Sequence, residues 1–486
     1  MGLEMKEVSL NYDISAIPLF ISSSMDPLGK SFNPDKHLKE EFVSNLTGSS
    51  MLEIASLSTI VPALILLRHS FCFKGLCDSL HSMKTTSKKN ENATIDCRSW
   101  RAFMDTLAID FLFIVLPILL FLTVLEEWTH ICAVCLIFLL LLRIGDRRLG
   151  SYSKRGSELA YSARENVSAY RVSMMIVTCL CILAVDFKIF PRRYAKTETY
   201  GTGLMDLGVG SFVLANSLVS RQARNVLSMK WKTVLQSTSP LIILGVGRLI
   251  FTAGVDYQVH VGEYGVHWNF FFTLAAVSIL TSLINISPQY CGILGLSILI
   301  GYQICLMCGL NEFLLSKERA KDVISQNKEG LFSIFGYWGM YLVGVQLGNF
   351  LFFGNNQRTR TRIWLLAVIF WLLTIILDRN VERVSRRMCN LAYVMFVLAQ
   401  NFQVLAILVL SDFLPGRKTS VLEEVFNRNL LGSFLLANVM TGLINMNMNT
   451  ISASSITALV ILVGYAFVLS VLSGFTAFSG IKLKFW

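Results

Sequence analysis

The chain has 486 residues, of which 53% are hydrophobic and only 15% are charged, and its formal net charge is +11. Soluble globular proteins carry about 25% charged residues, so this composition excludes an ordinary soluble protein. It also excludes a nucleic-acid-binding protein, because the sequence has no soluble basic domain with aromatic platforms.

Apolar runs of nearly 20 residues recur along most of the length, and a helix of about that length spans a hydrocarbon layer of about 30 Å. We therefore predict an all-α polytopic membrane protein with about thirteen transmembrane helices, in a single multi-span domain over residues 41–480. The predicted spans lie near residues 51–68, 104–124, 129–143, 172–188, 203–220, 233–252, 269–287, 290–310, 331–353, 363–377, 390–411, 429–447 and 455–477.

The N-terminal segment is polar, and the short C-terminal tail carries two lysines. Residues 1–40 lack the pattern of a signal peptide, and Met25 offers a second start, so we expect residues 1–24 to be a dispensable extension. The tail 481–486 contains Lys482 and Lys484 and resembles a dilysine signal for retrieval to the endoplasmic reticulum. Two lysines that anchor the last helix at the membrane surface explain the same residues equally well.

The distribution of Lys and Arg predicts the orientation of the chain. With a luminal N-terminus, the cytosolic loops hold 25 of these residues and the luminal loops hold 12. The C-terminus is then cytosolic. The twelve exceptions lie in three loops, 188–196, 317–328 and 379–387, and positive charge kept on the disfavoured side suggests a function there, such as holding an anionic headgroup.

The stretch between the fourth and fifth spans is the most unusual part of the sequence. It places seven charged residues within positions 186–206, and charge between membrane spans is costly unless it faces water, a partner or a substrate. Asp186 lies at the end of the fourth span, and Lys196 follows after Pro191, which ends or kinks that helix. A chain reversal would bring the Lys196 ammonium back toward the Asp186 carboxylate. The pair then serves either as a base beside an oxyanion-stabilising cation or as a structural ion pair.

Two pairs of adjacent arginines fall in the predicted luminal loops, Arg192-Arg193 and Arg386-Arg387. Guanidinium groups match the geometry of phosphate, so we predict that these four residues bind a phosphate-bearing substrate. Anchoring of helix ends at the membrane surface is the commoner use of such pairs and remains the alternative.

The segment before the seventh span carries His260, Glu263 and His267. Their spacing differs from that of zinc proteases, and no further ligand is evident. His267, next to Trp268 and Asn269, is instead a candidate acid or base, with Asn269 as a substrate hydrogen-bonding group; a purely interfacial histidine is the alternative. No metal site is expected, since the CxxC pairs at Cys132 and Cys305 lie in apolar helices.

The twelfth span is rich in amides, and its asparagines are expected to serve helix packing or to line a polar cavity; they are Asn438, Asn445, Asn447 and Asn449. The sequence has no nucleophile elbow, P-loop, kinase signature or metal box. Residue chemistry therefore predicts a polytopic protein with a charged luminal pocket and leaves the reaction open.

Several long motifs, in order along the chain, resemble the GPI-inositol acyltransferase family, also called the GPI-anchored wall transfer proteins. The resemblance runs from about residue 38 to 477, and it departs from the family at Lys188, where a proline is expected. The motifs are KEEFVSNLTGSSMLEI, AVDFKIFPRRYAKTETYGTGLMDLGVGSFV, EYGVHWNFFFTL, NKEGLFSIFGY, VSRRMCNLAYVMF and LLANVMTGLINM.

The resemblance implies a multi-pass enzyme of the endoplasmic reticulum membrane with a luminal active site. It implies transfer of a palmitoyl-like group from acyl-CoA, a cosubstrate, to the inositol 2-hydroxyl of glucosaminyl-phosphatidylinositol, with no bound cofactor. Asp186 and Lys196 match the family's proposed catalytic Asp and Lys. Asp186 would act as base, Lys196 would stabilise the thioester oxygen, and apolar grooves would hold the acyl chain and the tails of membrane lipids.

Two other classes of protein remain as alternatives. A transporter or lipid scramblase also carries charged residues beside discontinuous spans, but the charges here cluster at the level of the loops. An inactive assembly factor would depend on neither Asp186 nor Lys196.

Overall fold

The computed structural model describes residues 41–42, 44–70, 97–150, 162–226, 231–253, 261–284, 286–316, 318–354, 356–414 and 419–481. The predicted polar segment 1–40, His260 and the two lysines of the C-terminal tail lie outside the described residues. The chain divides into Met1–Phe42 and a compact unit, Val43–Trp486, to which all of the following helices belong.

Ten helical stretches in the described residues are long and apolar enough to cross a membrane. They are α2 (Met51–Ser70), α4 with η1 and α5 (Cys97–Asp110, Phe111–Val115 and Leu116–Phe121), α6 with η2 (Thr129–Gly150 and Glu126–Trp128), α7 (Ser162–Ala184), α12 with η4 and α13 (Pro288–Cys305, Leu306–Leu310 and Asn311–Leu315), α15 (Lys328–Phe353), α16 (Asn356–Asn380), α17 with η5 (Leu391–Val409 and Leu410–Phe413), α19 (Leu430–Asn447) and α20 (Ser455–Phe478).

Three further helices have shorter apolar stretches: α8 (Leu204–Leu218), α9 (Trp231–Ala253, apolar over Val234–Ile250) and α11 (Phe270–Ile284). Short helical turns connect the long elements, namely η3 (Arg192–Tyr194), α10 (Val261–Tyr264), α14 (Val323–Gln326) and α18 (Val421–Arg428). The described residues form no strand, and the β-bridges found among them are isolated ones between Gly48, Ser49 and Thr202.

The all-α polytopic prediction is confirmed, and each of the thirteen predicted spans corresponds to one of these helices. The number that cross the membrane and the orientation stay predictions. One boundary differs in a way that matters for the site. The fourth span was expected to continue to residue 188, but α7 ends at Ala184, so Asp186 lies just beyond the helix in a turn.

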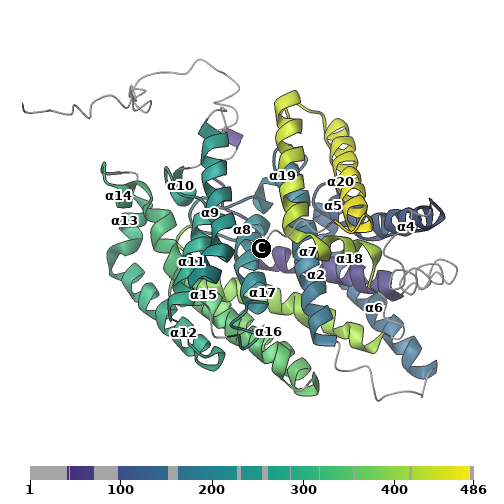
Figure 1. The fold of residues 1–486 in the computed structure, drawn as a ribbon, viewed down its shortest axis with the longest axis horizontal. Coiled ribbons are helices and arrows are strands. Elements are labelled where there is room, and N and C mark those ends of the chain that lie inside the picture. Colours follow the sequence, from purple (N-terminus) through teal and green to yellow (C-terminus); the bar gives the residue numbers. More distant parts are fainter. Residues whose placement is uncertain are drawn as a thin grey trace, which may run out of the picture. The chain divides into compact units, whose positions relative to one another are not determined.

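Helix α17 forms the centre of the packing and is buried along almost its whole length. Its N-terminus is capped by Asn390, whose side chain accepts a hydrogen bond from the backbone N–H of Tyr393. It packs against α2, α7, α8, α15 and α16, and these elements surround it in Figure 1. A helix that is apolar on all sides can be buried in this way only when other helices cover every face.

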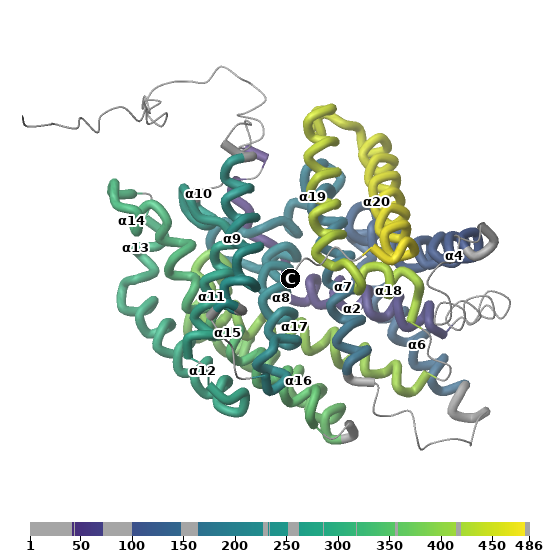
Figure 2. The backbone as a smooth tube through the Cα atoms, in the orientation of Figure 1, coloured from purple at the N-terminus to yellow at the C-terminus, as the bar shows by residue number. Residues whose placement is uncertain are grey.

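Helices α11, α12 and α15 lie side by side, as the tube in Figure 2 shows. Small residues allow the close approach of α12 and α15: a Cβ added to Gly295 would lie 2.7 Å from the carbonyl oxygen of Gly339. Within a membrane, such small residues let backbones pack tightly and supply much of the helix association energy.

The polar contacts between loops separate into two groups. The first group joins the loops around Lys196, Glu263, Arg386 and Glu329, all of which were predicted on the luminal side. The second group joins elements near the predicted cytosolic ends, through the ion pairs Arg68–Asp110, His69–Glu423 and Arg360–Asp412. The three predicted luminal loops that carry Lys and Arg therefore lie together at one end of the helices. This grouping does not depend on which compartment that end faces.

Candidate active site

The 185–203 loop, which joins α7 to α8, is held in place by buried aromatic side chains. Phe187, Phe190 and Tyr194 are each fully buried, and Phe190 packs edge-on against Tyr194. Pro191 precedes the single 3-10 turn Arg192–Tyr194. Buried aromatic residues thus alternate with polar residues along this loop. The aromatic side chains hold the loop against the protein core, and the charged side chains between them are less buried.

Backbone contacts tie the end of this loop to two distant segments. Ser49 N donates to Thr202 O at 2.7 Å, and Gly201 N donates to Val384 O at 2.8 Å. Gly201 adopts a φ of +130°, and an added Cβ would lie 2.0 Å from the carbonyl oxygen of Thr47. Only glycine allows this crossing of three chain segments.

We expect Gly201→Ala to lower the free energy of unfolding by about 1–3 kcal/mol, because the new methyl group strains the backbone and collides with Thr47. The melting temperature of the detergent-solubilised protein measures this change. Gly247→Ala in α9 is the matched control, since an added Cβ there meets nothing within 4 Å. Equal melting temperatures for Gly201→Ala and the wild type would contradict the account.

Asp186 lies in the turn that follows α7, where it contacts α19. The side chain of Asn445 donates a hydrogen bond from Nδ2 to Asp186 Oδ2 at 2.8 Å. Arg192 donates to the carbonyl oxygen of Val185 at 2.6 Å. Burial lowers the pKa of Arg192 to about 10, while the negative charge of Asp186 acts in the opposite direction. Asp186 is thus a partly buried carboxylate between an amide donor and a guanidinium.

Lys196 ion-pairs with a residue from another loop. Its Nζ lies 2.6 Å from Glu263 Oε1, and Glu263 belongs to α10. The sequence suggested that the loop reversal would turn this ammonium toward Asp186, but the carboxylate it contacts is Glu263. In the sequence, Glu263 stands between two histidines and is 67 residues from Lys196, a separation that gives no pattern a single sequence reveals.

The same glutamate contacts the first arginine of the second pair. Arg386 Nη1 lies 3.2 Å from Glu263 Oε1, and Arg386 Nε donates to Asp206 Oδ1 at 2.6 Å. Asp206 also accepts from the backbone N–H of Thr197 at 3.0 Å. These four side chains, Lys196, Glu263, Arg386 and Asp206, form a continuous charge network, and Arg386 and Asp206 are almost completely buried within it.

The charge network changes the ionisation of Glu263. Burial alone would raise the pKa of its carboxyl group, but the positive charges of Lys196 and Arg386 outweigh burial and lower the pKa to about 2. Glu263 is therefore ionised at any physiological pH. It can position the Lys196 ammonium, but it cannot act as a base with a pKa near neutrality.

The other predicted substrate-binding arginines also contact carboxylates. Arg193 Nε donates to Glu53 Oε1 at 2.8 Å, and Arg387 Nη2 donates to Glu329 Oε1 at 2.9 Å. Glu329 is fully buried and also pairs with Arg319. These contacts attach the loops to α2 and α15. Binding of a substrate phosphate by Arg192, Arg193, Arg386 or Arg387 stays a prediction.

His267 and Asn269 lie near the start of α11. The His267 side chain is exposed, and its backbone N–H donates to Asn327 Oδ1 at 2.8 Å. Asn269 is buried; its Nδ2 donates to Gly245 O at 2.9 Å, and its Oδ1 accepts from the backbone N–H of Phe271. The Asn269 amide thus serves the fold by joining α11 to α9. A role in substrate contact stays a prediction for both residues.

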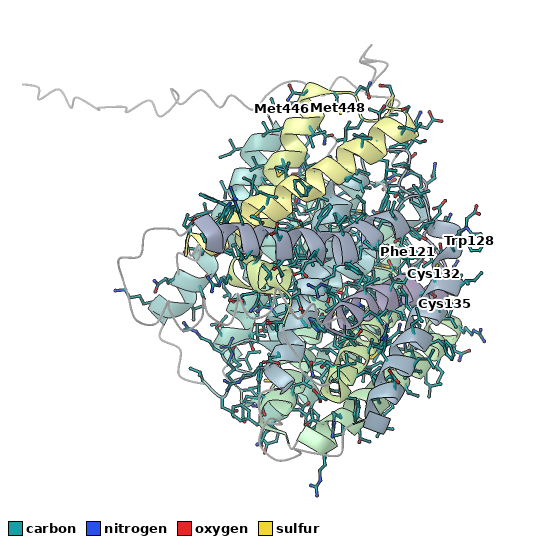
Figure 3. All side chains as sticks on the ribbon, turned by 90° about the vertical axis from the view of Figure 1, so that its right-hand side faces the viewer. Phe121, Trp128, Cys132, Cys135, Met446 and Met448 are labelled. Atoms are coloured by element: carbon teal, nitrogen blue, oxygen red, sulfur yellow. The ribbon has the colours of Figure 1, made fainter. Side chains whose placement is uncertain are left out.

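The cysteines of the two CxxC pairs lie on apolar helices, α6 and α12 with η4. No group of three His, Cys, Asp or Glu side chains among the described residues has the arrangement needed to hold a metal ion. Cys132 and Cys135 lie on α6, near one edge of the view in Figure 3.

An apolar cavity lies beside the 185–203 loop, between α2, α5, α7, α8 and α17. The empty space in this cavity and at its open mouth, which includes bulk solvent, is about 670 Å³. Its lining includes Leu204, the first residue after the loop, and Thr178, eight residues before Asp186. At 1.5 Å per helical residue, Thr178 lies about 9 Å along α7 from the end of that helix at Ala184. The cavity therefore extends from the base of the loop into the apolar core.

The region from before α2 to the end of α20 matches one protein family. The GWT1 family model matches residues 35–476, which include every residue of the site described above. This chain belongs to the GWT1 family. The resemblance stated from the motifs is thereby confirmed.

Relatives of the GWT1 family from three kingdoms are similar to this chain over most of its length. It is 54% identical to an uncharacterized protein of Arabidopsis thaliana over 431 residues, covering 87% of this chain and 98% of that one. It is 34% identical to GPI-anchored wall transfer protein 1 of Candida albicans over 485 residues, covering 89% and 95%. It is 32% identical to glucosaminyl-phosphatidylinositol-acyltransferase PIGW of Bos taurus over 524 residues, covering 93% and 99%.

Proposed function

We propose that this protein is an acyltransferase that acylates the inositol 2-hydroxyl of glucosaminyl-phosphatidylinositol in GPI-anchor biosynthesis. The acyl donor is acyl-CoA, and the protein is a multi-pass protein of the endoplasmic reticulum membrane. One observation carries the proposal: 93% of this chain aligns with a relative that is named as a glucosaminyl-phosphatidylinositol acyltransferase.

The 185–203 loop supports this chemistry. Asp186 accepts the proton of the inositol hydroxyl as the oxygen attacks the thioester carbonyl, and the Lys196 ammonium stabilises the negative charge that develops on the carbonyl oxygen. The C–S bond then breaks, and the departing thiolate takes up the proton to give free coenzyme A. A thioester is reactive enough for direct transfer, so the mechanism needs no covalent enzyme intermediate.

The apolar cavity supports the acyl-chain part of the proposal. It is lined mainly by aliphatic and aromatic groups, and it begins at Leu204, directly after the loop that carries Asp186 and Lys196. Each methylene buried there contributes about 0.8 kcal/mol, so a long acyl chain gains much of its binding energy from this space. The cavity would hold the fatty acyl chain while the thioester lies at the loop.

The position of the charges argues against a transporter or scramblase. Asp186, Lys196, Glu263 and Arg386 all lie in loops or in a short helical turn at the ends of the long helices. A transport site would instead place charges near mid-span, at the interface of broken helices. The charged groups here are arranged for a reaction at the membrane surface.

The proposal is tested with the purified protein in detergent, labelled palmitoyl-CoA and glucosaminyl-phosphatidylinositol. The expected result is time-dependent formation of the inositol-acylated glycolipid and release of one thiol for each ester formed. Phosphatidylinositol without the glucosamine serves as the comparison acceptor. No product from a folded, monodisperse sample would overturn the proposal and favour transport.

We expect Gly208→Leu to shift the preferred acyl chain toward shorter donors. Gly208 lines the cavity, and an added Cβ meets nothing within 4 Å, so the leucine side chain can occupy space that an acyl chain would fill. If it displaces about four methylene groups, the loss is about 3 kcal/mol. The ratio of kcat/KM for C16 over C12 acyl-CoA should then fall on the order of 10²-fold.

Gly464→Leu in α20 is the control for this prediction. Gly464 is exposed, an added Cβ there also meets nothing within 4 Å, and the residue does not line the cavity. Its acyl-length profile should match that of the wild type. An unchanged profile for folded Gly208→Leu would show that the acyl chain binds elsewhere.

A further inference from the structure

Asn445 is placed to act on the substrate together with Asp186. It lies in the last turn of α19, and α19 packs against α7, the helix that leads into the 185–203 loop. Its Nδ2 donates a hydrogen bond to Asp186 Oδ2 at 2.8 Å across 259 residues of sequence. The amide therefore belongs to the immediate surroundings of the carboxylate that the mechanism uses as a base.

Other asparagines of the same segment behave differently. Asn438 Nδ2 donates to Phe434 O at 2.8 Å, and Asn447 Nδ2 donates to Leu443 O at 2.7 Å, so each bonds only to its own helix four residues earlier. Both of these side chains are exposed. The neighbouring Met446 is also exposed, and its label stands at the free end of α19 in Figure 3. Asn445 alone among these three asparagines reaches into the site.

The oxygen of the Asn445 amide, Oδ1, has no hydrogen-bond partner within the described part of the chain. This oxygen is buried from solvent. The orientation of the amide is fixed by its neighbour, because a flipped amide would place the carbonyl oxygen against the Asp186 carboxylate. A buried, unused carbonyl oxygen is costly, and such atoms call for a functional explanation.

Asn445 Oδ1 lies close to the base. The nitrogen and oxygen of an amide are about 2.3 Å apart, so Asn445 Oδ1 is within roughly 5 Å of Asp186 Oδ2. Two hydroxyl groups on adjacent carbons of a ring are near enough to each other for one to bond each of these oxygens. The Asn445–Asp186 pair thus offers two acceptors to a vicinal diol.

We propose that Asn445 Oδ1 accepts a hydrogen bond from the hydroxyl next to the one that Asp186 deprotonates. This inference rests on the proposed function, and it assigns Asn445 as a substrate-binding residue that selects an acceptor with neighbouring hydroxyls. In an inositol acylated at position 2, with the phosphate at position 1, the free neighbour is the 3-hydroxyl. A site built around such a hydrogen bond discriminates strongly against an acceptor that lacks the group.

The test compares kcat/KM for two proteins, each with two acceptors, as in a double-mutant cycle. Wild type and Asn445→Ala are assayed with glucosaminyl-phosphatidylinositol and with its 3-deoxy-inositol analogue. For the wild type, kcat/KM should fall by about 10²-fold with the analogue. Asn445→Ala should lose a similar factor with the natural acceptor and less than threefold more with the analogue, since the contact is already absent.

Two results would overturn the assignment. Equal rates of the wild type with both acceptors would show that the 3-hydroxyl is not read, and this result does not depend on how any variant folds. Losses that multiply in Asn445→Ala with the analogue would show that the residue and the hydroxyl act independently. Absence of product from the wild type with the natural acceptor would instead contradict the proposed function itself.

Asn438→Ala and Asn447→Ala are the matched controls, because they remove the same side chain from the same helix without touching Asp186. Both should show the wild-type loss with the 3-deoxy analogue. A melting temperature for each variant separates a change in acceptor recognition from a change in folding.

Discussion

Asp186→Asn should lower the rate of acyl transfer by about 10²- to 10⁴-fold, the usual contribution of a general base. The protein should remain folded, because the substitution keeps the size of the side chain. The new amide oxygen can still accept the hydrogen bond that Asn445 Nδ2 donates at 2.8 Å to the native carboxylate. Initial rates with labelled palmitoyl-CoA measure the effect, and binding of glucosaminyl-phosphatidylinositol should persist.

Lys188→Ala is the control for this prediction. Lys188 lies two residues from Asp186, but its side chain is exposed, so its removal should leave the rate within about threefold of the wild type. If folded Asp186→Asn still transfers the acyl group at a substantial rate, the proposed activity stands and another residue is the general base. His267, whose side chain is exposed near the start of α11, would then be the next residue to replace.

The sequence predicted the elements of this fold well, because spanning helices are encoded locally. Each apolar run of sufficient length became a helix, and the unusual charge in the 185–203 loop marked the region in which Asp186 and Lys196 lie. The end of α7 was placed four residues too far along the chain, since apolar residues continue past Ala184 into the turn. Hydropathy reports which residues avoid water and does not report where a helix turns.

The partners of the charged groups could not be predicted in the same way. The arginine pairs were interpreted as phosphate ligands, whereas Arg193 and Arg386 contact Glu53 and Asp206, which are 140 and 180 residues away. Such pairs depend on how the helices pack, which no local pattern records. A signal was nevertheless present: carboxylates are scarce in this chain, and those near the predicted luminal ends of spans are the available counter-ions.

Asn445 shows that residues of the same type in one segment can make different contacts. The sequence shows a run of asparagines in the twelfth span, and it predicts helix packing or the lining of a polar cavity for all of them alike. Asn438 and Asn447 each bond to their own helix, while Asn445 contacts Asp186. Asn447 is two residues from Asn445, so its side chain lies on another face of the helix. Asn438 is seven residues from Asn445, on nearly the same face but two turns, or about 10 Å, farther from Asp186.

Glu263→Gln should impair both stability and catalysis. Glu263 Oε1 contacts Lys196 Nζ at 2.6 Å and Arg386 Nη1 at 3.2 Å, so neutralising it leaves two cations facing one remaining carboxylate, Asp206. Displacement of the Lys196 ammonium by about 1 Å is enough to lower kcat about 10²-fold. Glu198→Gln is the matched control, since Glu198 is an exposed carboxylate of the 185–203 loop, which also carries Lys196.

The stability effect has a defined pH dependence. The pKa of Glu263 is lowered from 4.5 to about 2, which corresponds to on the order of 3 kcal/mol of stabilisation. Because the pKa of the folded state is depressed, this stabilisation is fully present above pH 4.5 and is lost as the pH falls toward 2. Melting temperatures of wild type and Glu263→Gln should therefore differ by a constant amount from pH 8 to 5 and converge below that range.

The same reasoning separates the role of Glu263 from that of the base. Since Glu263 stays ionised far below neutral pH, any loss of wild-type activity between pH 7 and 5 must come from another group. The acidic limb of the rate profile should therefore lie at the same pH in Glu263→Gln, with a lower plateau. A limb that moves with this substitution would mean that the charge network sets the pKa of the catalytic group, and Glu263 would then tune the chemistry as well as position Lys196.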